Sequence, residues 1–216
     1  MREQDRTFIV SGGSSGLGRA TAGAFARIGA YVAIFDIAEP ADAIVEELPA
    51  DRVKFYEWNI ISTSNVEGSV QDVIEWSNET HAPLGGICCA GMLSPGKIIR
   101  SSFEPLALST IRNAINISLV GTIDLNEGKR GVFIMVSSAA EYDGQPGQVV
   151  YSATKGAIRS LTLPLARDLS RYGIRAVSIA PNMFSAAMIA KGKMPEKARQ
   201  AIERHFVWPR RAGNPD

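Results

Sequence analysis

The chain has 216 residues, of which 45% are hydrophobic and 21% charged, a composition that supports one folded domain with a sizeable core. Its 23 basic and 22 acidic side chains leave a net charge of +1, so bulk charge favours neither nucleic acid nor an anionic membrane as a partner. No apolar run reaches the ~18 residues of a membrane span and the N-terminus is polar, so we expect a soluble cytoplasmic protein, with the mitochondrial matrix as the alternative compartment.

The cysteines and histidines argue against disulfides and metals. Cys88 and Cys89 are adjacent in the sequence, and neighbouring cysteines seldom form a structural bridge, so we expect a reducing compartment. His81 and His205 lack the cluster of further ligands that a zinc site requires, and we therefore expect no metal.

Short strand-like runs alternate with helix-like segments along the chain. The predicted strands are residues 7–10, 31–36, 53–59, 85–91, 131–138 and 174–180. The predicted helices are residues 16–28, 41–48, 65–80, 103–120 and 149–172. This alternation indicates a parallel sheet covered on both faces, and the apolar fourth and fifth strands are typical of strands buried on both sides. We therefore predict a doubly wound α/β fold.

A glycine-rich turn, SGGSSGLG, connects the first predicted strand to the first predicted helix. A dinucleotide pyrophosphate binds best where backbone N–H groups and the positive end of a helix converge, and large side chains there would keep the phosphate away. The glycines follow a G-x-x-x-G-x-G spacing. The predicted cofactor contacts in this turn are Gly12, Ser14, Ser15, Gly16, Leu17 and Gly18.

Asp36 ends the second predicted strand, 20 residues after Gly16, where a carboxylate accepts hydrogen bonds from an adenosine ribose. The same carboxylate would repel a 2'-phosphate, no base follows it directly, and the turn carries Ser15 in place of a base. These features favour NAD over NADP; the alternative is an aspartate that only caps the next turn. We predict one NAD-binding Rossmann domain, with three αβα layers, over residues 1–216.

The stretch SSAAEYDGQPGQVVYSATKGA, residues 137–157, carries the candidate catalytic groups. Tyr151 and Lys155 are four residues apart and project from one face of the predicted helix, whereas Ser138 ends the fifth predicted strand. An ordinary tyrosine has a pKa of about 10, so we expect Lys155 to lower the pKa of Tyr151 by stabilising its phenolate. Tyr151 would then remove a substrate proton while hydride passes to a nicotinamide, with Ser138 holding the substrate oxygen.

Together these motifs resemble the short-chain dehydrogenase/reductase family over almost the whole chain. The resemblance rests on SGGSSGLG, on Ser138, on the YxxxK of Tyr151 and Lys155, and on Asn116 in NISLVGT. It implies that Lys155 also binds the nicotinamide ribose and that Asn116 helps to hold a proton-relay water. Residues 144–184 look nearest to the 3-hydroxyacyl-CoA dehydrogenase type II branch, which also acts on hydroxysteroids, although loops set the substrate in such folds.

The resemblance implies further cofactor contacts, at some of which this sequence departs from the family pattern. Besides Tyr151 and Lys155 they are Asn59, Ile60, Cys89, Ala90, Gly91, Pro181, Phe184 and Ser185. Asn59 replaces an adenine-contacting aspartate, and its amide oxygen can still accept a hydrogen bond. Ala186 replaces a threonine that contacts the nicotinamide carboxamide in the family, and the neighbouring Ser185 is the expected substitute.

Two segments are shorter than the family pattern. The stretch from Asn116 to Ser138 leaves room for a short helix only, and the chain stops at Asp216, before a C-terminal strand. The resemblance implies a four-helix interface and a homodimer or homotetramer, which a short helix would weaken. Outward apolar positions Leu161, Leu165 and Leu169 serve either that interface or the sheet, and we assign most of them to the sheet.

The sequence thus favours an NAD-dependent oxidoreductase that interconverts a small secondary alcohol and a ketone, with a 3-hydroxyacyl-CoA or hydroxysteroid-like substrate. The alternative is a catalytically silent nucleotide-binding protein that keeps the fold for partner binding. The intact Ser-Tyr-Lys set favours the enzyme, whereas the shortened segments favour the alternative.

Overall fold

The structure, a computed structural model, describes residues 4–39, 51–59, 63–82, 84–88, 131–184, 203–204 and 211–214. In chain order its elements are β1 (Thr7–Ser11), α1 (Gly16–Arg27), β2 (Tyr31–Asp36), β3 (Val53–Glu57), α2 (Thr63–Glu79), β4 (Leu84–Cys88), β5 (Val132–Val136), the 3-10 helix η2 (Ala139–Glu141), α5 (Val149–Ser170) and β6 (Arg175–Ile179). All six predicted strands are present, with bounds that differ by a few residues. The helices predicted at 41–48 and 103–120 lie outside the described residues.

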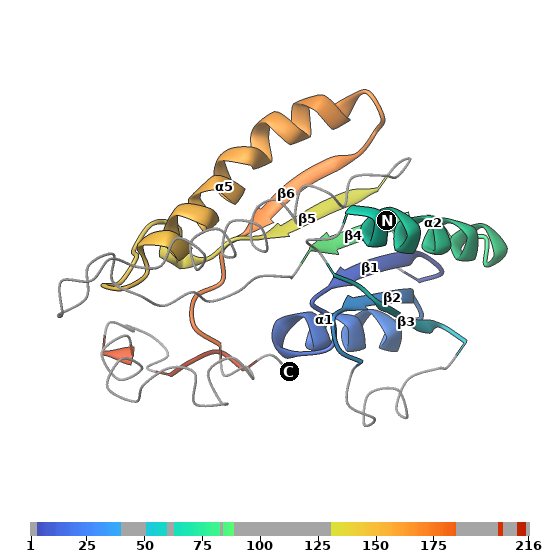
Figure 1. The fold of residues 1–216 in the computed structure, drawn as a ribbon, viewed down its shortest axis with the longest axis horizontal. Coiled ribbons are helices and arrows are strands. Elements are labelled where there is room, and N and C mark those ends of the chain that lie inside the picture. The colour runs from blue at the N-terminus through green and yellow to red at the C-terminus, as the bar shows by residue number, and fades with distance from the viewer. Residues whose placement is uncertain are drawn as a thin grey trace.

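The six strands form one parallel sheet in the order β3-β2-β1-β4-β5-β6 (Figure 1). The chain therefore moves outward from β1 to β3, returns to β4 beside β1, and then moves outward in the other direction. Doubly wound proteins bind their ligands at the carboxyl ends of the strands, at the place where the strand order reverses. The predicted α/β class with a parallel sheet is confirmed, and its reversal point lies between β1 and β4.

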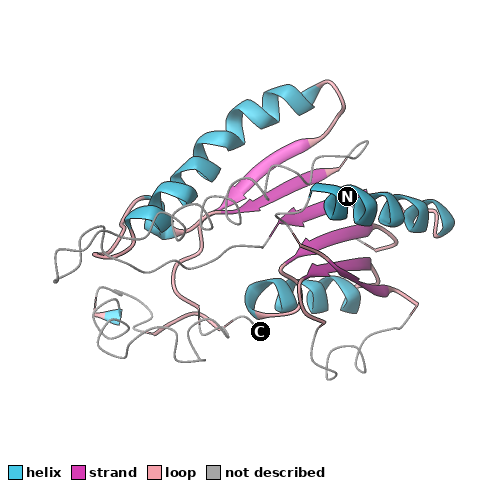
Figure 2. Cartoon of the chain, viewed as in Figure 1, coloured by secondary structure: helices cyan, strands magenta, loops and turns pink. Residues whose placement is uncertain are grey.

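Two hydrophobic clusters cover the two faces of the sheet because successive strand residues point to opposite sides. On one face Val10 and Ile34 pack with Ala22 of α1. On the other face Ile9 and Phe35 pack in a cluster that also takes in buried side chains of α2 and α5. Figure 2 shows α1 on one side of the strands and α2 and α5 on the other. The described part of the chain thus has three layers.

Helix α5 lies along β6 and β5 (Figure 1), and its Ile158 side chain is fully buried. Leu161 and Leu165 pack against the cluster that contains Ile158, so the assignment of these positions to the sheet is confirmed. Leu163, by contrast, is 57% exposed. Val149, at the first position of α5, is also exposed, so the helix presents two large apolar side chains to the surroundings of the described structure.

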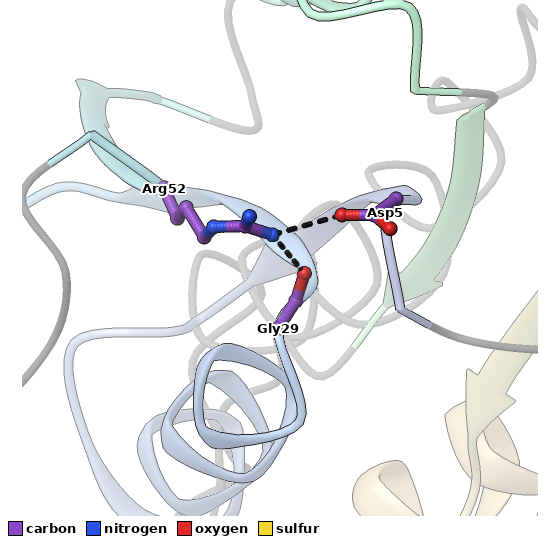
Figure 3. Close-up of polar contacts among 3 residues, drawn as sticks. All are labelled: Asp5, Gly29 and Arg52. Carbon is purple, nitrogen blue, oxygen red and sulfur yellow. Dashed lines mark hydrogen bonds and ion pairs between the residues drawn. The ribbon is translucent and has the colours of Figure 1, made fainter.

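A polar cluster ties the far end of α1 to the start of β3 (Figure 3). Nη1 of Arg52 donates hydrogen bonds to Oδ1 of Asp5, at 3.1 Å, and to the carbonyl oxygen of Gly29. The hydrogen bond with Asp5 raises the pKa of the Arg52 guanidinium. The guanidinium also lies over the ring of Tyr31, 4.9 Å from its centroid. These contacts fix the turn that follows α1.

Candidate active site

The turn between β1 and α1 is shaped by its glycines. Gly12 and Gly16 adopt left-handed backbone angles, with φ of 68° and 55°, which side chains disfavour. A Cβ on Gly18 would lie 2.3 Å from the carbonyl oxygen of Gly12, so only glycine lets the first turn of α1 approach the loop this closely. Ser15 precedes α1 without a side-chain cap, so its hydroxyl does not occupy the N–H groups at the start of this helix.

One buried hydroxyl in this turn tests whether a phosphate group fits. The Oγ atom of Ser14 is buried and has no hydrogen-bond partner in the structure as described. A buried hydroxyl without a partner destabilises a fold, and such groups are commonly satisfied by a ligand or an ion. Because this hydroxyl lies beside the N-terminus of α1, the turn fits the pyrophosphate of a dinucleotide.

Asp36 connects this turn to the end of β2. Its Oδ2 atom accepts the backbone N–H of Ser14 at 3.0 Å, and its Oδ1 atom accepts that of Ile37 at 2.8 Å. Each carboxylate oxygen has a second lone pair, which remains for a ligand hydroxyl. The Ile37 bond is the local cap that the alternative interpretation of Asp36 required, but the Ser14 bond joins Asp36 to the glycine turn as well.

Asn59 lies just beyond β3, the strand next to β2, at the same edge as Asp36. Its backbone N–H donates to Oδ1 of Asn65 in α2 at 2.6 Å, and the residue is exposed. The N–H of Trp58, one residue earlier, donates to the carbonyl oxygen of Asp36 at 2.8 Å. The structure therefore brings the two residues assigned to the adenosine half of the cofactor to neighbouring strand ends.

Ser138, Tyr151 and Lys155 come together beyond the end of β5. Ser138 precedes η2, and its Oγ accepts the N–H of Ala140 at 3.2 Å. The side chains of Ser138 and Tyr151 are hydrogen-bonded to each other. Lys155 is only 4% exposed, and its Nζ donates to the carbonyl oxygen of Val136 at 2.8 Å. One end of the sheet thus carries a serine, a tyrosine and a lysine within a short distance of one another.

The pKa of Tyr151 is shifted in the opposite direction from the one expected from the sequence. Burial raises its pKa, and the hydrogen bond with Ser138 acts in the opposite direction but is the smaller effect. The Nζ atom of Lys155 lies over the ring, 5.8 Å from its centroid, and donates to the Val136 carbonyl oxygen, and the expected lowering of the Tyr151 pKa does not prevail over burial. The pKa of Tyr151 is therefore raised, the opposite of the direction expected from the sequence.

Of the remaining predicted cofactor contacts, some lie in the part of the chain that the structure describes and the others lie outside it. The carbonyl oxygen of Pro181 accepts the N–H of Ala139 at 2.9 Å, so the segment after β6 lies against η2. Phe184 forms a parallel bridge with Gly213, where a Cβ would lie 2.8 Å from the Phe184 ring. The residues outside the described part of the chain are Ile60, Cys89, Ala90, Gly91, Asn116 and Ser185.

Among the residues that the structure describes, no group of three or more His, Cys, Asp or Glu side chains is arranged to hold a metal ion. No helix in the same part of the chain is long and apolar enough to cross a membrane.

Comparison with known proteins identifies the family that shares this arrangement. The profile described as short chain dehydrogenase matches residues 6–197, which contain every element from β1 to β6. The chain belongs to the short-chain dehydrogenase family. It is therefore an oxidoreductase whose family implies a nicotinamide cofactor and a small-molecule substrate.

Several relatives and solved structures are similar to this chain over most of its length. The 3-hydroxyacyl-CoA dehydrogenase type-2 of Drosophila melanogaster is 34% identical over 223 residues, covering 96% of this chain and 85% of the relative. The Rattus norvegicus protein of the same name is 31% identical, covering 96% and 83%. A crystal structure of 3-hydroxyacyl-CoA dehydrogenase type-2 from Mycobacterium avium is 28% identical with a TM-score of 0.84, covering 100% of this chain and 87% of that one. The sheet is thus the Rossmann fold of the short-chain dehydrogenases.

Sequence reasoning missed two polar residues of this short-chain dehydrogenase site. Ser137 and Glu141 form a hydrogen bond beside Ser138, and Ser137 also contacts the backbone of Lys155. The adjacent serines at 137 and 138 were the available signal, but the contact depends on how α5 packs on β5.

Proposed function

We propose that this short-chain dehydrogenase uses NAD to interconvert a secondary alcohol and a ketone. The observation that carries the proposal is the convergence of Ser138, Tyr151 and Lys155 beyond the end of β5. This arrangement counts against the alternative of a catalytically silent protein, because a fold kept for partner binding has no need of three reactive groups in one place.

The chain's own residues account for binding the substrate oxygen and for moving its proton. Ser138 Oγ and Tyr151 Oη together hold that oxygen, and Tyr151 Oη transfers the proton. When bound, NAD supplies the acceptor or donor of hydride. Because burial raises the pKa of Tyr151, alcohol oxidation, in which Tyr151 must accept a proton, should improve as pH rises. Asn116 is proposed to support the proton relay.

Preference for NAD is supported by the position of Asp36. Its carboxylate lies at the end of β2 and is joined to the glycine turn through the N–H of Ser14. A ribose with free hydroxyls can donate to this carboxylate, whereas a 2'-phosphate would meet a second negative charge. We propose that the pyrophosphate contacts the unpartnered Ser14 hydroxyl and the first turn of α1.

For the substrate we propose a 3-hydroxyacyl-CoA thioester or a hydroxysteroid-like alcohol. The names of the Drosophila melanogaster and Rattus norvegicus relatives support the first of these. We also propose a homodimer or homotetramer in the cytoplasm, with the exposed Leu163 of α5 at a contact between copies.

The test is NAD reduction measured with a panel of 3-hydroxyacyl-CoA thioesters and hydroxysteroids, using the wild-type chain and Tyr151→Phe. We expect wild-type turnover with at least one class, and none with the variant. Binding of NAD without turnover of any panel member would favour the silent alternative. Equal turnover by Tyr151→Phe would show that another group transfers the proton.

A further inference from the structure

Ser137, immediately before Ser138, has one hydroxyl proton and two acceptors. Its Oγ lies 2.6 Å from Oε2 of Glu141 and 2.8 Å from the backbone carbonyl oxygen of Lys155. The side chain is 3% exposed, so water does not compete for either contact. The shorter contact, to Glu141, has the length typical of a hydroxyl that donates to a carboxylate, and the same proton is shared with the Lys155 carbonyl oxygen in a three-centre hydrogen bond. Ser137 therefore joins a charged side chain to the helix that carries the reactive lysine.

The three partners come from three different elements. The N–H of Ser137 donates to the carbonyl oxygen of Ile179 at 2.7 Å, which anchors Ser137 to β6. Glu141 is the last residue of η2, and Lys155 lies in α5. Since Ser138 is at the start of η2, the contacts of Ser137 connect the segment that carries Ser138 to the helix that carries Tyr151.

The side chain and the backbone of Lys155 contact two consecutive residues, Val136 at the end of β5 and Ser137 directly after it. Its Nζ donates to the carbonyl oxygen of Val136, and its own carbonyl oxygen accepts from Ser137. A shift of α5 along the sheet would lengthen both contacts together. The position of Tyr151, one helical turn earlier, is then fixed relative to Ser138 through the same two contacts.

We propose that Glu141 is a positioning residue which, through Ser137, holds the backbone of Lys155 and the Ser138–Tyr151 pair in the arrangement that the reaction uses. The proposal rests on the proposed function for its catalytic consequence, but the geometry that it invokes can be measured without turnover. Glu141 is placed for this role because its carboxylate accepts from Ser137 while leaving the Ser138 hydroxyl to Tyr151.

The first test compares three variants in the NAD-linked assay. Glu141→Ala removes the acceptor, and we expect kcat to fall by about 10- to 100-fold, the cost of misplacing reacting groups, with the Kd for NAD unchanged. Glu141→Gln keeps an amide oxygen that can accept from Ser137, so it should recover most of the lost kcat. Asp143→Ala removes the same charge from an exposed position two residues away and should leave kcat unchanged.

A double variant tests whether Glu141 acts through Ser137. We expect Ser137→Ala combined with Glu141→Ala to lower kcat no further than the more damaging single substitution, because both interrupt one connection. If the fold-losses in kcat of the two single variants multiply in the double variant, the proposed connection is overturned.

The second test needs no turnover. Absorbance titration of tyrosinate is recorded with and without Glu141→Ala, and each curve is corrected with its Tyr151→Phe counterpart to isolate Tyr151. The hydrogen bond with Ser138 lowers the pKa of Tyr151, so loosening that pair should move the Tyr151 titration to higher pH. A loss of folding stability alone would not move it.

The outcomes separate the two proposals. If the wild-type chain turns over no panel member but Glu141→Ala moves the Tyr151 titration, the proposed function fails and the positioning role of Glu141 stands. If the wild-type chain is active and Glu141→Ala retains full kcat with an unchanged Tyr151 titration, the positioning role is overturned and the proposed function stands.

Discussion

The backbone N–H of Ser14 donates a hydrogen bond of 3.0 Å to Oδ2 of Asp36, although 22 residues separate them in the sequence. This bond makes Asp36 part of the glycine turn as well as the end of β2. A substitution at Asp36 is therefore expected to affect two properties, the selection of the cofactor and the shape of the turn that receives its phosphates.

We predict that the wild-type chain binds NAD more tightly than NADP, and that Asp36→Asn reduces this preference. Asparagine keeps one oxygen for the Ser14 N–H but removes the charge that repels a 2'-phosphate. Fluorescence titrations with both cofactors measure the ratio of the two Kd values. Asp36→Ala serves as the comparison, since it should weaken both cofactors by freeing the turn. Equal wild-type affinities would contradict the prediction.

Tyr151→Phe should lower kcat by about 10²- to 10⁴-fold, the usual contribution of general acid–base catalysis, and leave the Kd for NAD nearly unchanged. The reason is that the lost hydroxyl acts on the substrate proton. Steady-state kinetics and NAD titration on the same preparation check both halves. Tyr142→Phe is the matched control, because Tyr142 is 69% exposed in the nearby loop. A large loss of NAD affinity would mean that Tyr151 has a structural role in the cofactor site.

Two glycine-to-alanine substitutions should have opposite effects on stability. At Gly18 the new Cβ would meet the Gly12 carbonyl oxygen at 2.3 Å, and we expect a loss of about 1–3 kcal/mol in the free energy of unfolding, together with weaker NAD binding. At Gly68, within α2, no atom lies within 4 Å of the new Cβ, and alanine should stabilise the helix by about 0.5–1 kcal/mol. Chemical denaturation measures both; a neutral Gly18→Ala would show that the turn relaxes freely.

Tyr56 should make stability depend on alkaline pH. Burial, together with the charges of Asp72 and Glu79, raises the pKa of Tyr56 to about 12. Since the folded protein holds the proton more tightly than the unfolded chain, this stabilisation is fully present below about pH 10 and is lost as pH rises towards 12. The free energy of unfolding of the wild type should therefore fall relative to that of Tyr56→Phe over this range. Parallel pH curves for the two proteins would contradict the assignment.

The strands could be predicted closely because their signals are local. The run TFIV and the run YVAIFD are apolar and bounded by turn residues, and β1 and β2 end within one residue of the prediction. The face on which α5 carries its buried leucines could also be predicted, because most of a periodic apolar face on a helix that covers a sheet is buried. Leu161 and Leu165 follow this rule.

The direction of the Tyr151 pKa shift and the contact of Ser137 with Glu141 could not be predicted from the sequence in this way. Spacing places Tyr151 and Lys155 on one helical face, but it does not say whether Nζ reaches the phenol oxygen or a carbonyl of the strand beneath. In the structure it reaches the carbonyl of Val136, and burial then decides the pKa of Tyr151. Such outcomes depend on the register of a helix against a sheet, which no local pattern encodes.

The burial of Lys155 has a consequence for chemical labelling. Amine-reactive reagents modify a lysine only when its Nζ is exposed and uncharged, and Lys155 has 4% of its surface accessible. Lys54, on the edge strand β3, is exposed and should be acylated readily. Mass spectrometry of the peptide that contains Lys155 would then record how often the start of α5 separates from the sheet, so this amine reports on local opening in the folded protein.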